Sequence, residues 1–143
     1  MTLFLPLLAI WLLTACTAIA DKNPDRMEKI ESLQETSWWV EDIAGKGVVD
    51  MSHTTIEFTD DGRIVGSTGC NRYFGSVEID GSMITMGPLA GTRMACAEAL
   101  MDQESRFFQA MSRVVSWQIA DTGLLHLRDA DGISQLRASR TEP

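Results

Sequence analysis

The sequence predicts a mainly β protein with a curved antiparallel, barrel-like sheet wrapped around one amphipathic helix. Three observations predict this class: turn dipeptides recur along the chain, apolar and polar residues alternate between them, and a single stretch has helical periodicity. Alternation with a period of two gives a strand one buried and one solvated face, whereas a period near 3.6 gives a helix an apolar stripe.

Four dipeptides mark the expected hairpin turns: Asp61-Gly62, Asp80-Gly81, Thr122-Gly123 and Asp131-Gly132. Glycine follows the first residue each time, as type I′ turns favour, because both central residues of that turn have positive φ. The flanking residues alternate, with Ile56 and Phe58 on one face and Leu125 and Leu127 on another. The segment from Tyr73 to Asp80 alternates in the same way. We expect about eight short strands in all.

The predicted helix lies within Ala97 to Val115 and gives way to a strand near Val114. Its apolar stripe comprises Leu100, Met101, Phe107, Phe108, Met111, Val114 and Val115. No Ser, Thr or Asp stands at its start as a cap, so its first residue is uncertain by a few positions. Glu104 lies inside the apolar stripe, where a bare carboxylate would be costly. We expect a structural partner for it, either Arg93 or backbone N–H groups.

Composition limits the classes of function. The chain has 143 residues and a formal charge of −8, and all its charged residues follow Ala20. That length fits one domain and a targeting segment. An acidic body argues against a nucleic-acid surface and against a polybasic membrane-binding patch. We expect a monomer.

The N-terminus is typical of a lipoprotein signal. An apolar run from Leu3 to Ala15 is rather short for a helix that spans a bilayer and has the length of a signal-peptide core. It ends in Leu13-Thr14-Ala15-Cys16, which resembles the lipobox of bacterial lipoproteins. In that class the cysteine carries acyl chains such as palmitate, and Thr17 in place of Asp implies the outer membrane, facing the periplasm. Two alternatives stay open: cleavage after Ala20, giving a soluble periplasmic or secreted form, and an uncleaved anchor.

These features divide the chain into a signal peptide (1–15), a lipidated cysteine with a tether (16–36) and a folded domain (37–140). With Cys16 assigned to lipid, Cys70 and Cys96 remain as an even pair in an oxidising compartment. We expect a disulfide, worth roughly 3–4 kcal/mol in the chain-entropy treatment. Two buried thiols and a redox pair are the alternatives. Gly69 and Gly75 flank the first cysteine and allow φ values that a side chain would forbid.

Tests for catalytic and metal chemistry are negative. His53 and His126 are isolated and lack zinc-site spacing. The segment Asp129–Gly132 begins like a calcium loop, but Arg140 stands where the closing Glu is needed, so we interpret it as a hairpin turn. Trp38, Trp39 and Trp117 could line a binding groove, although core packing is the commoner role for such residues. We therefore expect no cofactor, no metal and no enzymatic activity.

Two segments carry a family resemblance: Gly69-Cys70-Asn71-Arg72-Tyr73-Phe74-Gly75 and Thr92-Arg93-Met94-Ala95-Cys96. Together with Trp38 and the stretch from Glu104 to Met111 they resemble the META/HslJ domain. One departure is Ala90-Gly91 before Thr92, where the family commonly has Ala-Thr-Thr. The resemblance implies a small barrel-like sheet around a helix, with Gly69, Asn71, Arg72, Gly75, Arg93 and Glu104 as motif residues.

The resemblance also implies an envelope lipoprotein linked to heat stress and novobiocin tolerance, with no established enzymatic activity. The first hypothesis is therefore a non-enzymatic outer-membrane module that supports envelope integrity. The family's structural likeness to pilotin lipoproteins suggests a second role, the escort of a secretion or outer-membrane partner. For that role we expect an apolar cleft between helix and sheet that takes a lipid tail or a partner's helix.

Overall fold

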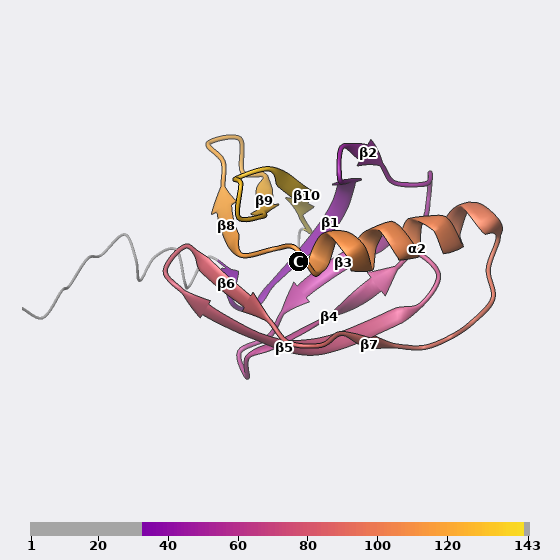
Figure 1. Cartoon of the computed structure of the whole chain (residues 1–143), viewed down its shortest axis with the longest axis horizontal. Coiled ribbons are helices and arrows are strands. Elements are labelled where there is room, and N and C mark those ends of the chain that lie inside the picture. Colours follow the sequence, from indigo (N-terminus) through magenta and orange to yellow (C-terminus); the bar gives the residue numbers. More distant parts are fainter. Residues whose placement is uncertain (1–32, 142–143) are drawn as a thin grey trace, which may run out of the picture.

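The computed structural model describes residues 33–141, which form a β-barrel and one α-helix (Figure 1). The strands are β1 (Thr36–Ile43), β2 (Lys46–Gly47), β3 (Thr54–Phe58), β4 (Arg63–Thr68), β5 (Arg72–Asp80), β6 (Met83–Met86), β7 (Ala90–Gly91), β8 (Ser116–Ile119), β9 (Leu125–Arg128) and β10 (Ser134–Arg140). The helix α2 (Glu98–Met111) lies between β7 and β8 in the chain.

Eight strands close into a ring in the order β1-β3-β4-β5-β6-β8-β9-β10, and β10 pairs with β1. All pairings are antiparallel; β2 pairs with β1 and β7 with β5, outside the ring. The weakest seam joins β6 to β8, where the register contains the single pair Met83↔Ser116. The predicted barrel-like sheet with one helix is thus confirmed. Because β6 and β8 pair at one position only, the end of β6 is not covered by β8.

All four predicted hairpin turns are present. Gly62, Gly81, Gly123 and Gly132 have φ between 59° and 82° and lie between successive paired strands. The predicted turn type is wrong, because the residues that precede these glycines are not in the left-handed region. At the β5–β6 hairpin Asp80 pairs with Met83, so Gly81 and Ser82 form a two-residue loop with positive φ at its first residue only, as in a type II′ turn. The other three hairpin loops are longer, and positive φ is confined to their glycine.

The alternating strand patterns place one face in the core. In β3 the residues Ile56 and Phe58 are buried and Glu57 is exposed, as predicted. The largest fully buried side chains come from strands around the whole ring and from the helix: Trp38, Trp117, Tyr73, Phe58, Phe107, Leu33, Ile43, Ile56, Ile64, Met111, Leu125 and Leu127. The barrel is therefore filled by side chains, as expected for a barrel of this size.

The helix α2 lies across the sheet and sends part of one face into the barrel core (Figure 1). It ends at Met111, before the predicted end at Val115. The chain turns at Ser112 and enters β8 at Ser116, so the strand predicted to begin near Val114 is present. The absence of a side-chain cap at its start is confirmed. Its buried residues are Gln103, Phe107, Ala110 and Met111, whereas Met101, predicted in the apolar stripe, is 37% exposed.

The predicted signal peptide, Cys16, the alternative cleavage after Ala20 and most of the tether lie outside the described residues. Leu33, at the start of the described chain, is fully buried, and its carbonyl accepts a hydrogen bond from the Thr36 hydroxyl at 2.5 Å. Packing of the domain therefore begins before the predicted boundary at residue 37.

Within residues 33–141, no helix has both the length and the apolar character required to cross a membrane.

Candidate functional site

The two motif segments meet at a disulfide. Cys70 and Cys96 are bonded at an S–S distance of 2.03 Å with their Cα atoms 6.0 Å apart, as expected from the sequence. The bond joins the β4–β5 turn to the segment before α2. Gly69 has φ of 93°, the conformation predicted for it, but Gly75 does not have positive φ. A Cβ at Gly75 would lie 2.6 Å from Leu89 Cδ2, so close approach of another segment explains that glycine.

Asn71 makes a second connection between these segments. Its side chain is buried, and its Oδ1 accepts hydrogen bonds from Thr92 Oγ1 at 2.8 Å and from Met94 N at 2.7 Å. Its Nδ2 donates to Met94 O and to Glu104 Oε1, both at 3.2 Å. One amide thus fixes residues 92–94 and contacts the helix, using both its acceptor and its donor capacity.

Glu104 has a structural partner, but not one of those expected. Its Oε2 accepts from Thr68 Oγ1 at 2.5 Å, and its Oε1 accepts from Asn71 Nδ2. Within residues 33–141 no salt bridge joins it to Arg93, whose side chain is exposed, as is that of Arg72. The motif arginines therefore lie at the surface and the motif amide and carboxylate lie together.

Gln103 joins Asn71 and Glu104 in one polar cluster, although it is not among the residues of the predicted apolar stripe. It is fully buried, and its Oε1 accepts from Val49 N at 2.6 Å. Its Nε2 lies 2.8 Å from Thr54 Oγ1 and 2.9 Å from Thr68 O. Its position four residues before Phe107 puts it on the buried stripe, and that spacing is the signal that could have identified it.

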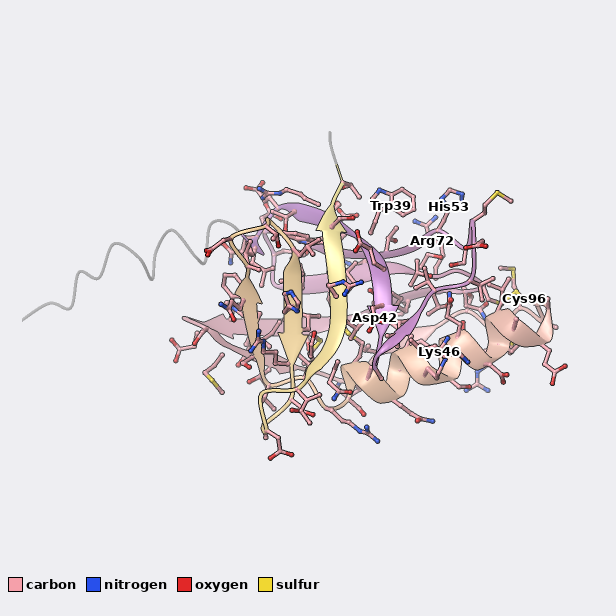
Figure 2. All side chains as sticks on the ribbon, turned by 90° about the horizontal axis from the view of Figure 1, so that it is seen from above. Trp39, Asp42, Lys46, His53, Arg72 and Cys96 are labelled. Carbon is pink, nitrogen blue, oxygen red and sulfur yellow. A yellow bond between two sulfur atoms is a disulfide. The ribbon has the colours of Figure 1, made fainter. Side chains whose placement is uncertain are left out.

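Gln103 holds a strained loop in place. Met51 and His53, two residues apart, have φ of 57° and 45°, a region that residues with a side chain rarely adopt. Such strain persists only where surrounding contacts impose it, and it often marks functional segments. Met51 is 90% exposed, and the His53 ring lies 5.2 Å from the Trp39 ring (Figure 2).

The three tryptophans considered above divide between core and surface. Trp38 and Trp117 are buried in the core. Trp39 is 40% exposed and, with the loop from Val48 to His53, lines a shallow hollow of about 320 Å³.

An apolar hollow of about 450 Å³ lies between the last turns of α2 and the segment that follows β6. It is lined by Met86, Gly87, Pro88, Leu89, Phe108, Met111, Ser112 and Val114. This volume falls in the range of small-molecule pockets, and mostly apolar walls with few polar groups are typical of them. None of the lining residues is charged, and Ser112 supplies the one hydroxyl. The hollow lies beside the helix, as the sequence hypothesis requires, but the segment after β6 rather than the face of the sheet forms its other wall.

Tyr73 on β5 is buried between the helix residue Phe107 and Thr55 of β3. Burial raises the pKa of its phenol well above the ordinary value, so the hydroxyl stays protonated and donates to Thr55 O at 2.9 Å. Its ring packs on Phe107 at 4.9 Å between centroids. Tyr73 therefore serves the packing of the helix rather than proton transfer.

The described part of the chain contains no cluster of three or more His, Cys, Asp or Glu that could hold a metal ion. Asp129, the first residue of the calcium-like segment, accepts hydrogen bonds from the backbone N–H groups of Asp131 and Ile133. This is an Asx-type turn, which agrees with the hairpin interpretation.

A META domain model matches residues 31–142, which include all of the described region. The chain belongs to the META domain family. No curated protein matches it in sequence.

Three solved structures resemble this META domain. A protein from Burkholderia xenovorans, determined by NMR, is 24% identical, with a TM-score of 0.64; the match covers 94% of this chain and all of the other. A second NMR structure is 27% identical, with a TM-score of 0.59, covering 76% and 90%. A crystal structure of a DUF4847 family protein from Bacteroides vulgatus is 16% identical, with a TM-score of 0.59, covering 82% and 99%. The first and third show the fold alone.

Replacing Gln103 by Leu should lower the unfolding free energy of the META domain by about 2 kcal/mol or more. The variant leaves buried partners such as the Val49 N–H without a hydrogen bond, and each such group costs about 1–3 kcal/mol. Hydrogen exchange should quicken first in the loop from Val48 to Thr54. Gln109→Leu, at an exposed position of the same helix, is the control and should change stability by about 0.5 kcal/mol or less. Equal unfolding free energies for the two variants would show that Gln103 does not secure the loop.

Proposed function

We propose that this META domain is a non-enzymatic outer-membrane lipoprotein that faces the periplasm, binds an apolar group beside α2 and supports envelope integrity under heat or novobiocin. The observation that carries the proposal is the uncharged hollow of about 450 Å³. Met86 and Met111 contribute to its wall, and methionine side chains adapt to apolar groups of varied shape. An apolar occupant fits because no lining group would pair a buried charge.

The disulfide supports the proposed compartment. Disulfides form and persist in the periplasm and outside the cell, and they are rare where thiols are kept reduced. The Cys70–Cys96 bond leaves Cys16 as the odd cysteine, in the position that the lipobox assigns to acylation. Acyl chains contribute about 0.8 kcal/mol for each buried CH₂, so several of them would anchor the domain stably.

The polar cluster supports a non-enzymatic role. Glu104, Asn71 and Gln103 are the inward-directed groups that sequence reasoning would test first for chemistry. Each uses its hydrogen-bonding atoms on protein partners, which fixes loops to the helix. Such satisfied groups act as structural supports, whereas catalytic groups must be free to meet a substrate.

A pilotin-like escort role is the second candidate, and the same hollow favours it. An apolar face of a partner helix docks in a groove through side chains at helical spacing, and a groove edged by flexible methionines suits that mode. A photocrosslinker at Ser112, which lines the hollow and is exposed, would distinguish the two. Capture of a secretin or outer-membrane assembly subunit supports escort, and recovery of none contradicts it.

Blocking the hollow should remove function without unfolding the domain. Ser112→Trp places a bulky ring at the hollow from an exposed position. Expressed in a deletion strain, it should fail to restore growth in heat or novobiocin. Ser105→Trp, also exposed on α2 but outside the hollow, should restore growth fully. Full rescue by both variants would contradict the role of the hollow, and a deletion strain that grows like wild type under both stresses would contradict the stress role.

Lipidation at Cys16 has its own test. Cys16→Ser should leave an uncleaved precursor or, through cleavage after Ala20, a soluble periplasmic form. Membrane fractionation with an antibody to the chain reports which occurs. Unchanged residence in the outer membrane would show that acylation at Cys16 does not anchor the protein.

A further inference from the structure

The outward face of β8, β9 and β10 differs in charge from the rest of the molecule. The inward residues of these strands, such as Trp117, Leu127 and Ala138, are buried in the core. The outward residues include His126, Arg128 and Arg137 and no carboxylate, in a chain with 20 acidic and 12 basic residues. We call this surface the basic face. Composition hides it because the chain as a whole is acidic and its members come from two strands, β9 and β10.

The strand register brings the three basic residues together. Arg137 on β10 pairs directly with His126 on β9, and Arg128 follows two residues later on the same face of β9. Directly opposed residues have Cβ atoms about 5 Å apart, and residues two apart on one face about 7 Å. Like charges this close repel each other, so an anion would relieve a cost built into the sheet.

The hydrogen bonds leave donors available on this face. Ser134 Oγ donates to Leu136 O at 3.2 Å, so its oxygen accepts from His126 Nδ1 at 3.1 Å. His126 Nε2 is then a donor only when the ring is protonated. The Nε of Arg128 is buried, so it is not one of these donors. The terminal guanidinium nitrogens of Arg128 and Arg137 form no hydrogen bond within residues 33–141 and supply them.

The groups that face His126 are mostly positive. Burial, and then the charges of Arg128 and Arg137, lower the pKa of His126. The carboxylate of Glu41 on β1 lies 3.6 Å from Arg137 Nε in an exposed pair, which contributes little energy. Gln118 on β8, opposite His126, is uncharged.

Exposed apolar side chains lie at both ends of the basic face. Trp39 on β1 pairs with Ser139 near the end of β10 and is 40% exposed (Figure 2). Ile133, at the β9–β10 hairpin, is 60% exposed. Tryptophan favours the headgroup level of a bilayer, and arginine near an anionic surface contributes about 1 kcal/mol. Cationic groups framed by exposed apolar residues therefore match an anionic bilayer surface rather than a soluble anion.

We propose that the basic face, with Trp39 and Ile133, docks onto phospholipid headgroups that carry a phosphate and a net negative charge. The arginines bind phosphate oxygens, for which the planar guanidinium is well suited. The indole of Trp39 and the side chain of Ile133 enter the interface. In the cell this docking rests on the proposed membrane anchoring, which would keep the face near a bilayer. The docking itself does not require the acyl chains on Cys16.

Vesicle binding of a chain that begins at Asp21 tests the docking without the anchor. Every barrel strand and α2 lies within residues 33–141, so this chain keeps the complete fold. It should sediment with vesicles of phosphatidylglycerol and phosphatidylcholine mixed, and not with phosphatidylcholine alone. Arg128→Gln with Arg137→Gln should lower the partition coefficient on the order of tenfold or more. Arg63→Gln with Arg72→Gln, exposed on β4 and β5, is the matched control and should bind like wild type.

Two further readouts separate the contributions. Binding should strengthen as pH falls through the pKa of His126, and His126→Asn should remove that dependence. Trp39→Ala should weaken binding while thermal unfolding stays close to that of wild type. Equal binding to both vesicle types, or equal losses in the two arginine pairs, would overturn the proposal. Binding of inorganic phosphate without binding of vesicles would overturn it as well. So would a dimer of this chain in which the basic face is buried. Each outcome leaves the tests of the hollow and of Cys16 unaffected.

Discussion

The attachment of the first half of α2 to the barrel is the constraint on which the rest of the structure depends. A helix without a side-chain cap, preceded by an exposed segment, has little local reason to begin where it does. The Cys70–Cys96 bond fixes that segment to the β4–β5 turn, and Asn71 fixes it again through Met94. Gln103 and Glu104 then extend the attachment into the helix itself. The side-chain polar atoms of Asn71, Gln103 and Glu104 all have hydrogen-bond partners, which makes this attachment rigid and specific.

The second half of the helix is held by different forces, and the hollow follows from that difference. Phe107 and Met111 pack into the barrel core, whereas Phe108 and Ser112 face the segment after β6. That segment follows β6, which pairs with β8 at a single position. Its Leu89 side chain lies directly against Gly75 of β5. Polar contacts position one end of the helix, so the other end can leave apolar surface uncovered. This division agrees with the proposal that an apolar group binds beside the end of the helix.

The fold could be predicted from local patterns, while the details of the site depended on non-local contacts. Hairpin glycines and alternation identify strands because turn chemistry and burial act over a few residues. The type of the turns and the end of α2 were missed, since loop length and the path into β8 decide them. Gln103 was missed because its partners lie about fifty residues earlier in the chain. The basic face was missed for the same reason: register, which pairs Arg137 with His126, is not written in either strand alone.

Hydrogen exchange of oxidised and reduced protein tests the central claim most directly. A disulfide of this loop length contributes roughly 3–4 kcal/mol, and a domain with so complete a core should stay folded without it. The account predicts that reduction speeds exchange at Thr92, Met94 and the start of α2, while amides near Phe107 and Met111 stay protected. Exchange rates that do not change on reduction, or a cooperative loss of protection throughout the barrel, would contradict it.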